Sequence, residues 1–108
     1  MAQNFKILGQ IAPSATTATA IYTVPSATET VVSSIVICNR GAAGTFRLAA
    51  RPNGATLANE HYISYDTPVD ANDSIVLTIG LTLDAGDVLE GYASTADMSF
   101  SAYGSEVT

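Results

Sequence analysis

The sequence has few of the residue types on which enzyme and metal sites depend. Its 108 residues contain one histidine, one cysteine and no tryptophan. Because Cys38 is the only cysteine, no disulfide can form within the chain. A hydrolytic triad needs a base beside its nucleophile, and His61 is the only histidine available. Zinc sites need about four Cys, His or acidic ligands at short spacings, which this sequence does not offer. We therefore expect a protein that is not an enzyme and holds no metal or cofactor.

Positive charge is also scarce. Ten acidic residues accompany four basic ones, so the formal net charge is −6, and charged residues make up 13% of the chain. An average soluble domain has about 25%. Nucleic acids and anionic membranes bind through Lys and Arg, so we expect neither as a partner. Few charges also mean much uncharged surface, which is more favourable where copies of the chain or another protein cover it.

The acidic residues do not match a known cation site. Asp66, Asp70 and Asp73 lie in one predicted loop, and Asp84 and Asp87 lie in a predicted turn. Neither group has the spacing of a calcium-binding loop. Asp side chains in turns usually accept hydrogen bonds from nearby backbone, and we expect that role here.

Long apolar runs are missing as well. No run approaches the roughly 18 apolar residues of a membrane span. Residues 1–6 lead into no apolar segment of the kind found in signal peptides, so we expect a chain made in the cytoplasm without a sorting signal. Cys38 ends the short apolar run 35–38, where a free cysteine usually behaves as a small buried hydrophobic residue.

Apolar and other residues alternate along much of the sequence. Apolar residues occupy every second position from Ile75 to Leu83. A period of two predicts a strand with one buried face. The turn 84–87 separates this segment from two more predicted strands, at 88–93 and 98–103. We predict that these three consecutive strands pair antiparallel and form one half of a β-sandwich.

Five further strands are predicted, at 5–11, 19–24, 30–39, 45–51 and 60–65. The first is an edge strand or part of a flexible arm over 1–18, the segment 66–73 is a loop, and the tail 104–108 crosses to a neighbour or frays. No segment shows the spacing of apolar residues that indicates a helix. The sequence therefore predicts one all-β domain over residues 1–108. Its fold should be an antiparallel β-sandwich of about eight strands without helices, with jelly-roll or immunoglobulin-like Greek-key topology.

The segment Thr30–Asn39 is apolar on both predicted faces. Strict alternation gives two sets of residues: Val31, Ile35 and Ile37, and opposite them Val32, Val36 and Cys38. An antiparallel strand with one solvated face should alternate cleanly between apolar and polar residues. We therefore expect the face with Val32 and Val36 to be covered, either by a loop or by another subunit.

Two arginines share the outward face of the predicted strand 45–51. Arg47 and Arg51 could dock carboxylates of a partner or simply face solvent, and the sequence leaves both alternatives open. Tyr62 lies on the opposite face of its strand from His61. The candidate interface residues are thus Val32, Val36, Arg47, Arg51 and Tyr62. The five tyrosines could instead form a platform for stacking sugars.

Several short segments together resemble small virion proteins of tailed bacteriophages, including marine phages and cyanophages. They are 22–25 (YTVP), 33–40 (SSIVICNR), 65–68 (YDTP), 83–88 (LDAGDV), 92–95 (YAST) and 100–107 (FSAYGSEV). The resemblance covers roughly residues 20–107 and consists mostly of strand and turn patterns.

The resemblance implies a structural, non-enzymatic role in the virion. We expect a capsid decoration (cement) protein that forms a homo-oligomer, such as a trimer, and binds the major capsid protein. The alternatives are a component of the tail, neck or fibre attachment, or a carbohydrate- or receptor-binding β-sandwich module. The resemblance implies no catalytic residues.

Overall fold

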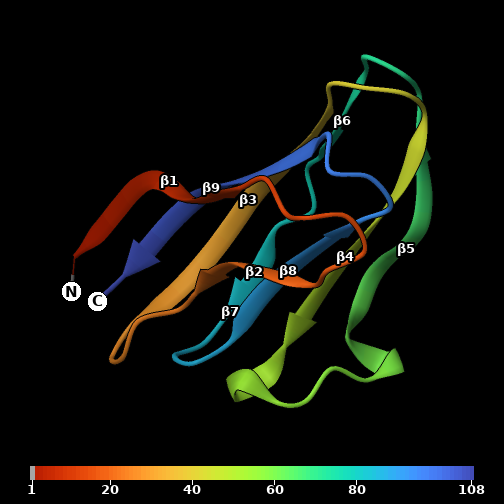
Figure 1. Ribbon diagram of the computed structural model, residues 1–108. Coiled ribbons are helices and arrows are strands. Elements are labelled where there is room, and N and C mark those ends of the chain that lie inside the picture. Colours follow the sequence, from red (N-terminus) through yellow and green to blue (C-terminus); the bar gives the residue numbers. More distant parts are fainter. Residues whose placement is uncertain (1) are drawn as a thin grey trace.

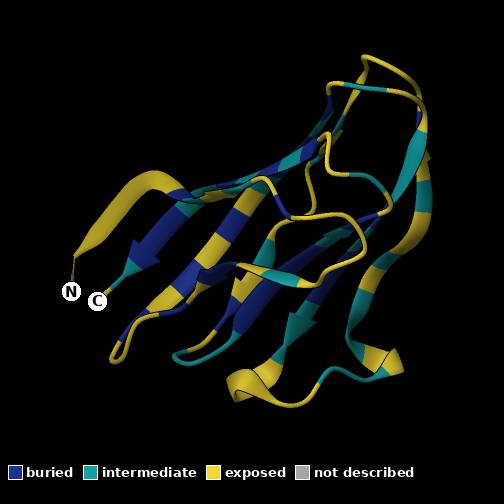
Figure 2. Ribbon diagram, viewed as in Figure 1, coloured by how far each residue is buried: buried dark blue, intermediate teal, exposed yellow. Residues whose placement is uncertain are grey.

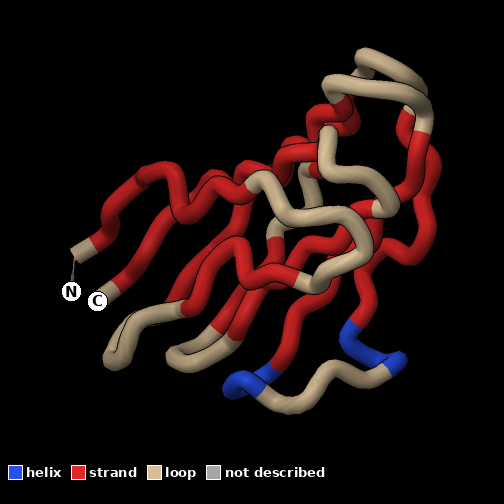
Figure 3. Tube along the Cα trace, viewed as in Figure 1, coloured by secondary structure: helices blue, strands red, loops and turns tan. Residues whose placement is uncertain are grey.

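The computed structural model describes residues 2–108 and contains nine strands. They are β1 (Gln3–Ile11), β2 (Thr19–Thr23), β3 (Glu29–Asn39), β4 (Gly44–Arg51), β5 (Tyr62–Val69), β6 (Ser74–Leu77), β7 (Leu81–Leu83), β8 (Val88–Ala93) and β9 (Met98–Val107). Two three-residue 3₁₀ turns, Pro52–Gly54 and Asn59–His61, are the only helical segments among the described residues (Figure 3). None of the helical segments within 2–108 has the length and apolar character needed to cross a membrane.

The strands form two antiparallel sheets packed face to face (Figure 1). Sheet A has the order β1-β9-β3-β6, with β7 also paired to β3, and sheet B has the order β2-β8-β4-β5. If β6 and β7 are counted as one interrupted strand, the eight strands alternate between the two sheets along the chain, except that β4 and β5 are consecutive neighbours in sheet B. This is the jelly-roll arrangement of eight strands. The predicted all-β sandwich is therefore confirmed, with the jelly-roll topology.

The pairing predicted for the last three strands is wrong. β7 and β9 both belong to sheet A, but β8 lies in sheet B between β2 and β4. Along the chain from β7 to β9 the strands change layer at each step, so they do not form a meander. The turn Asp84–Asp87 crosses from one sheet to the other instead of closing a hairpin within one sheet.

The long strand predicted from Ile75 to Leu83 is interrupted. β6 ends at Leu77 and β7 begins at Leu81, and Gly80 between them has a φ of 59°. That left-handed conformation suits glycine and breaks the ladder. Ile79 is consequently 39% exposed instead of buried in the core.

Two other predicted boundaries also differ. The tail does not fray as a unit, because β9 continues through Val107 and is paired on both sides. The loop predicted at 66–73 begins later than expected, because β5 runs from Tyr62 to Val69. Asp66 has a φ of 49°, so the local backbone departs from a regular strand there, while pairing with β4 resumes at Thr67.

The core lies between the two sheets (Figure 2). Its largest fully buried side chains come from both layers: Ile35, Ile37 and Phe100 from sheet A, and Phe46, Leu48 and Leu89 from sheet B. Phe46 and Phe100 meet edge to face, with ring centroids 6.1 Å apart. An offset or edge-to-face arrangement is the favourable one for aromatic rings. Phe46 and Leu48 of β4 are buried, which agrees with the outward positions predicted for Arg47 and Arg51 on the same strand.

Bulges beside β9 change the direction of side chains in sheet A. On the β1 side, Ile7 pairs with Tyr103 and Gly9 with Ala102, so Leu8 is an extra residue. On the β3 side, Ser34 pairs with Tyr103 and Val32 with Gly104, so Ser33 is an extra residue. An extra residue in a strand shifts every later side chain to the other face.

The close approach of β3 and β9 at this level requires glycine at position 104. A Cβ on Gly104 would overlap the backbone carbonyl of Val31, which cannot rotate away. Overpacking of this kind costs roughly 1–3 kcal/mol. The gain from restricting the unfolded chain is smaller, about 0.4–1 kcal/mol.

We therefore predict that Gly104→Ala lowers the free energy of unfolding, by about 1–2 kcal/mol after the two effects are combined. Urea denaturation followed by circular dichroism would measure the change. Ser101→Ala, on the same strand and half-exposed, is the control and should stay within about 0.5 kcal/mol of the original. Equal or higher stability of Gly104→Ala would show that the backbones can separate there.

Candidate functional site

The outer face of sheet A is the main apolar surface of the protein. The pairing registers place Phe5 and Ile7 of β1 in line with Ser105 and Tyr103 of β9. The next strands add three valines to this face: Val31, Val36 and Val76. We define the outer face of sheet A by these apolar residues and the Ser, Thr and Gln side chains between them.

Several of the apolar side chains on this face are well exposed. The exposed fraction is 80% for Phe5, 52% for Ile7 and 60% for Val76, and Figure 2 shows the first half of β1 as exposed throughout. Among the described strand residues of this face, only Glu29, at its margin, is charged. A broad, uncharged face with exposed large apolar residues is typical of a surface that contacts another protein.

The structure revises which predicted residues belong to this face. Val36 lies on it as predicted, and Cys38 lies beside it, half-buried instead of in the core. Val32 was predicted on this face, which is wrong: its side chain is 0% exposed, in the core with Ile35. The bulge at Ser33 is the cause, because it exchanges the faces of Val31 and Val32.

Sequence reasoning also missed Phe5, Ile7 and Val76. Simple alternation in β1 predicts Phe5, Ile7 and Ile11 on one side, but the bulge at Leu8 leaves Phe5 and Ile7 outside and turns Ile11 towards the core. One signal was available. The first 28 residues contain a single charged residue, Lys6, so apolar residues exposed there have few charges around them.

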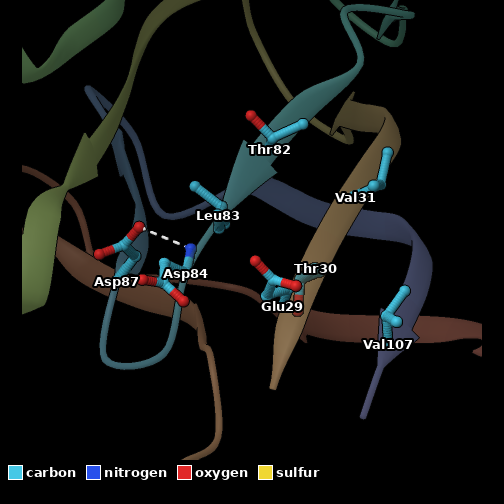
Figure 4. Close-up of a pocket in the computed structure, with 8 residues that line it drawn as sticks. All are labelled: Glu29, Thr30, Val31, Thr82, Leu83, Asp84, Asp87 and Val107. Atoms are coloured by element: carbon cyan, nitrogen blue, oxygen red, sulfur yellow. Dashed lines mark hydrogen bonds between the residues drawn. The ribbon is translucent and has the colours of Figure 1, made fainter. Parts of the chain in front are cut away.

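An open cleft of about 480 Å³ lies at one end of this face, where β3, β7 and β9 meet (Figure 4). Val31 and Val107 line one side of it. Asp84 and Asp87 lie on the other side, where Asp87 accepts a hydrogen bond from the backbone N–H of Asp84 at 2.8 Å. The cleft thus combines an apolar wall with an acidic one.

Of the five acidic residues predicted to accept backbone hydrogen bonds, Asp73, Asp84 and Asp87 do so, whereas Asp66 binds Arg47 instead. The second carboxylate oxygen of Asp87 accepts the N–H of Asn53 at 2.8 Å, Asp84 accepts the N–H of Ala85, and Asp73 accepts the N–H of Ser74. Within residues 2–108 no three His, Cys, Asp or Glu side chains gather in a way that could hold a metal ion.

The outer face of sheet B carries a cluster of arginine and tyrosine. The Arg47 guanidinium carbon lies 4.1 Å from the ring centroid of Tyr65 and 4.4 Å from that of Tyr92. Asp66 accepts two hydrogen bonds from Arg47, at 2.7 and 3.4 Å. These bonds, above all, raise the pKa of Arg47 above its ordinary value. Tyr62 packs edge to face against Tyr65, with centroids 4.8 Å apart.

Arg51 is also paired within the chain. It binds the buried carboxylate of Glu90 at 3.1 Å and the backbone carbonyls of Gly54 and Ala55. The structure therefore brings the predicted residues Arg47, Arg51 and Tyr62 to one face, opposite the face that carries Val36. Since both arginines already have carboxylate partners, this face is less suited to docking a partner's carboxylates than the sequence alone suggests.

His61 lies in the second 3₁₀ turn instead of a strand. Its Nδ1 accepts a hydrogen bond from the backbone N–H of Ala58 at 3.0 Å. This hydrogen bond from Ala58 to the imidazole therefore stabilises the local turn. A base for catalysis would instead need its free nitrogen directed at a nucleophile.

A network of hydrogen bonds around the buried Tyr22 and Glu106 connects β1 and β2 to β9 at the end of the sandwich near the cleft. The Tyr22 hydroxyl donates a hydrogen bond of 2.5 Å to Glu106 and lies 2.8 Å from the Thr30 hydroxyl. Lys6 donates to the other carboxylate oxygen of Glu106 at 3.2 Å. The bond from Tyr22 is the main cause that lowers the pKa of Glu106. Burial, followed by the bond to Glu106, raises the pKa of Tyr22 to about 12.

Comparisons with known proteins add no relative: no protein-family model matches the chain, and no curated protein sequence matches it significantly.

The network around Glu106 leads to a prediction about how the free energy of unfolding changes with pH. A carboxyl whose pKa is lowered by folding adds stability above its unfolded pKa of about 4.3, and the protein loses this stability as the pH falls through the folded pKa. We predict that Tyr22→Phe lowers the free energy of unfolding at pH 7 by about 1–3 kcal/mol, because Glu106 loses a charge-assisted bond while still buried. The difference from the original protein should shrink in acid.

Urea denaturation at several pH values would measure both effects. Tyr103→Phe, which removes a hydroxyl from the half-exposed outer face of sheet A, is the matched control. A Tyr22→Phe effect that is equally large in acid and at neutral pH would mean that the hydroxyl stabilises the fold independently of the Glu106 charge.

Proposed function

We propose that this chain is a non-enzymatic structural component of a bacteriophage virion, a capsid decoration protein that binds the particle through the outer face of sheet A. The observation that carries the proposal is the exposure of Phe5, Ile7 and Val76 on a face with almost no charge, in a protein whose net charge is −6. The resemblance of its sequence segments to small phage virion proteins supports the same role.

The chemistry of this face fits a protein partner. Nucleic acid binding requires clustered Lys and Arg, and three of the four basic residues are in ion pairs with the chain's own acids. A flat β-sheet face with scattered Ser, Thr and Gln between valines and aromatic rings can bury apolar area and still satisfy its polar groups at the rim. In this proposal, the covering surface belongs to a neighbouring virion subunit, the major capsid protein.

The architecture of the fold also suits this role. Most described residues lie in strands, and the first and last strands, β1 and β9, pair with each other along sheet A. Jelly rolls occur in viral capsid proteins and in lectins, so the fold by itself supports a structural role only by analogy. The same properties suit a tail, neck or fibre protein, and location on the particle is what the following test measures.

Mass spectrometry and immunogold labelling of purified virions would test the proposal. We expect the chain to be present on the capsid, and we expect Val76→Asp to reduce its attachment to particles at least about tenfold, because a charge would be buried without a partner. Ile63→Asp is the matched control: it places the same charge on an exposed residue of sheet B and should attach normally. Absence of the chain from virions would refute the proposal, and labelling of the tail would favour the alternative location.

A second candidate function rests on the tyrosine cluster of sheet B. Tyr65 is 55% exposed beside Tyr62 and Tyr92, as a sugar-stacking platform requires. Against it, Arg47 already covers one face of both the Tyr65 and Tyr92 rings. A carbohydrate would therefore have to stack on the remaining ring faces.

A glycan array would decide between the two functions. For a decoration protein we expect no glycan signal above background. A signal that Tyr65→Ala removes and Tyr103→Ala leaves intact would instead establish a carbohydrate-binding module, since Tyr103 lies on the opposite sheet.

A further inference from the structure

Three of the four sheet edges carry features that block pairing with another chain. β5 has two register shifts, a left-handed Asp66 and Pro68, which has no N–H to donate. β6 and β7 are an interrupted edge of four and three residues. β2 has five residues and a register shift, and its centre lies against β1, where a Cβ on Gly9 would overlap the Ile21 carbonyl. Interruptions, bulges, charges and proline are the usual protection of an edge strand.

The first half of the fourth edge, β1, has only one of these features, the charge of Lys6, which is paired with Glu106 of the same chain. The segment Gln3–Ile7 contains no proline and no acidic residue, and all five of its residues are exposed. It pairs with β9 on one side and protrudes past the rest of the sandwich on the other (Figure 1).

The register shows which backbone groups this edge offers. Ala2 and Thr108 exchange two backbone hydrogen bonds, at 3.0 and 2.9 Å. In an antiparallel pair such exchanges recur at every second residue, so Asn4 and Lys6 also bond to β9. The N–H and C=O groups of Gln3, Phe5 and Ile7 therefore point away from β9. They are three consecutive donor–acceptor sites on an open edge.

We propose that a second copy of this chain pairs with this edge, β1 against β1, in a twofold-symmetric dimer centred on Phe5. With the axis at Phe5, the outward groups of Gln3 meet those of Ile7 in the other copy, so all three sites on each copy are used. The Phe5 rings of the two copies become neighbours on the outer face of sheet A. The two A sheets then form one continuous sheet, as in other cases of strand addition at an edge.

The self-complementary spacing of the outward groups and the charge pattern of β1 both favour a second copy as the occupant of this edge. Lys6 is the only charged residue in β1, and it is neutralised by Glu106 of its own chain at 3.2 Å. The register centred on Phe5 places Lys6 opposite Asn4 of the second copy, so like charges do not face each other across the seam. A register centred on Lys6 would set the two lysines directly opposite each other, which is unfavourable.

This dimer deepens the proposed function, because it adds a second copy of the chain as the partner at the β1 edge of sheet A, but it does not require a virion. Failure of the two ideas can therefore be distinguished by measuring self-association and particle attachment separately.

The test uses Phe5→Pro, which removes the outward N–H without removing a bond to β9. Proline is tolerated where the N–H of an edge strand faces solvent. We expect the original protein to change from monomer to dimer as its concentration rises in sedimentation equilibrium. Phe5→Pro should dimerise about tenfold or more weakly, because the twofold axis doubles the loss of hydrogen bonds. Phe5→Ala keeps the N–H and is the control for loss of the ring; it should dimerise more tightly than Phe5→Pro.

Amide hydrogen exchange gives a residue-level readout. In dilute protein the amides of Asn4 and Lys6 should be protected and those of Gln3, Phe5 and Ile7 should exchange rapidly. At high concentration the second set should become protected as well. A monomer at every concentration, a trimer, or an oligomer unaffected by Phe5→Pro would overturn this inference. If such a protein still attaches to virions, the proposed function survives; if it does not, both fail.

Discussion

Two extra residues, Leu8 in β1 and Ser33 in β3, determine the surface of sheet A. Both lie beside Tyr103 of β9, one on each side, so sheet A changes register at a single level. Beyond that level, Phe5, Ile7 and Val31 face outwards, while Leu8 and Val32 enter the core. Without these bulges the same alternation would bury a different set of side chains, because a shift of one residue exchanges the two faces of a strand. Gly104 makes the arrangement possible, since the backbone of β3 lies where its Cβ would be.

The fold class could be read from the sequence because alternation, turns and the lack of a helical period are local properties. Register and sheet membership are not local. The bulge at Ser33 is set by pairing with β9, whose partner residues lie about 70 positions away, as with Ser33 and Tyr103. Strict alternation therefore assigned Val31 and Val32 to the wrong faces. For the same reason the three C-terminal strands looked like a meander, although β8 is held between β2 and β4.

The candidate sites were predictable to a similar degree. Alternation within β4 correctly placed Arg47 and Arg51 on one face, but their partners could not be foreseen. Asp66 was assigned to a loop, and only its left-handed backbone within β5 brings the carboxylate to Arg47. Glu90 lies on β8, whose position beside β4 is itself a long-range result. Alternation correctly placed Val36 on the outer face of sheet A. The outward position of Phe5, which is 80% exposed, depends on the bulge at Leu8, which the sequence does not reveal.

The distribution of charge shows through which side of the sandwich association meets the least repulsion. All ten acidic residues lie at or after Glu29, mostly in turns and on sheet B, and only Lys6 carries charge before it. At physiological salt, charges repel appreciably only within about 8 Å. Two copies, or a copy and another acidic protein, therefore meet least repulsion through β1 and the outer face of sheet A. Contacts through the turns would bring Asp70, Asp73 or Asp97 close to like charges. The same acids that give the chain its net negative charge thus favour association through one side of the sandwich, where the unpaired edge and the exposed apolar side chains both lie.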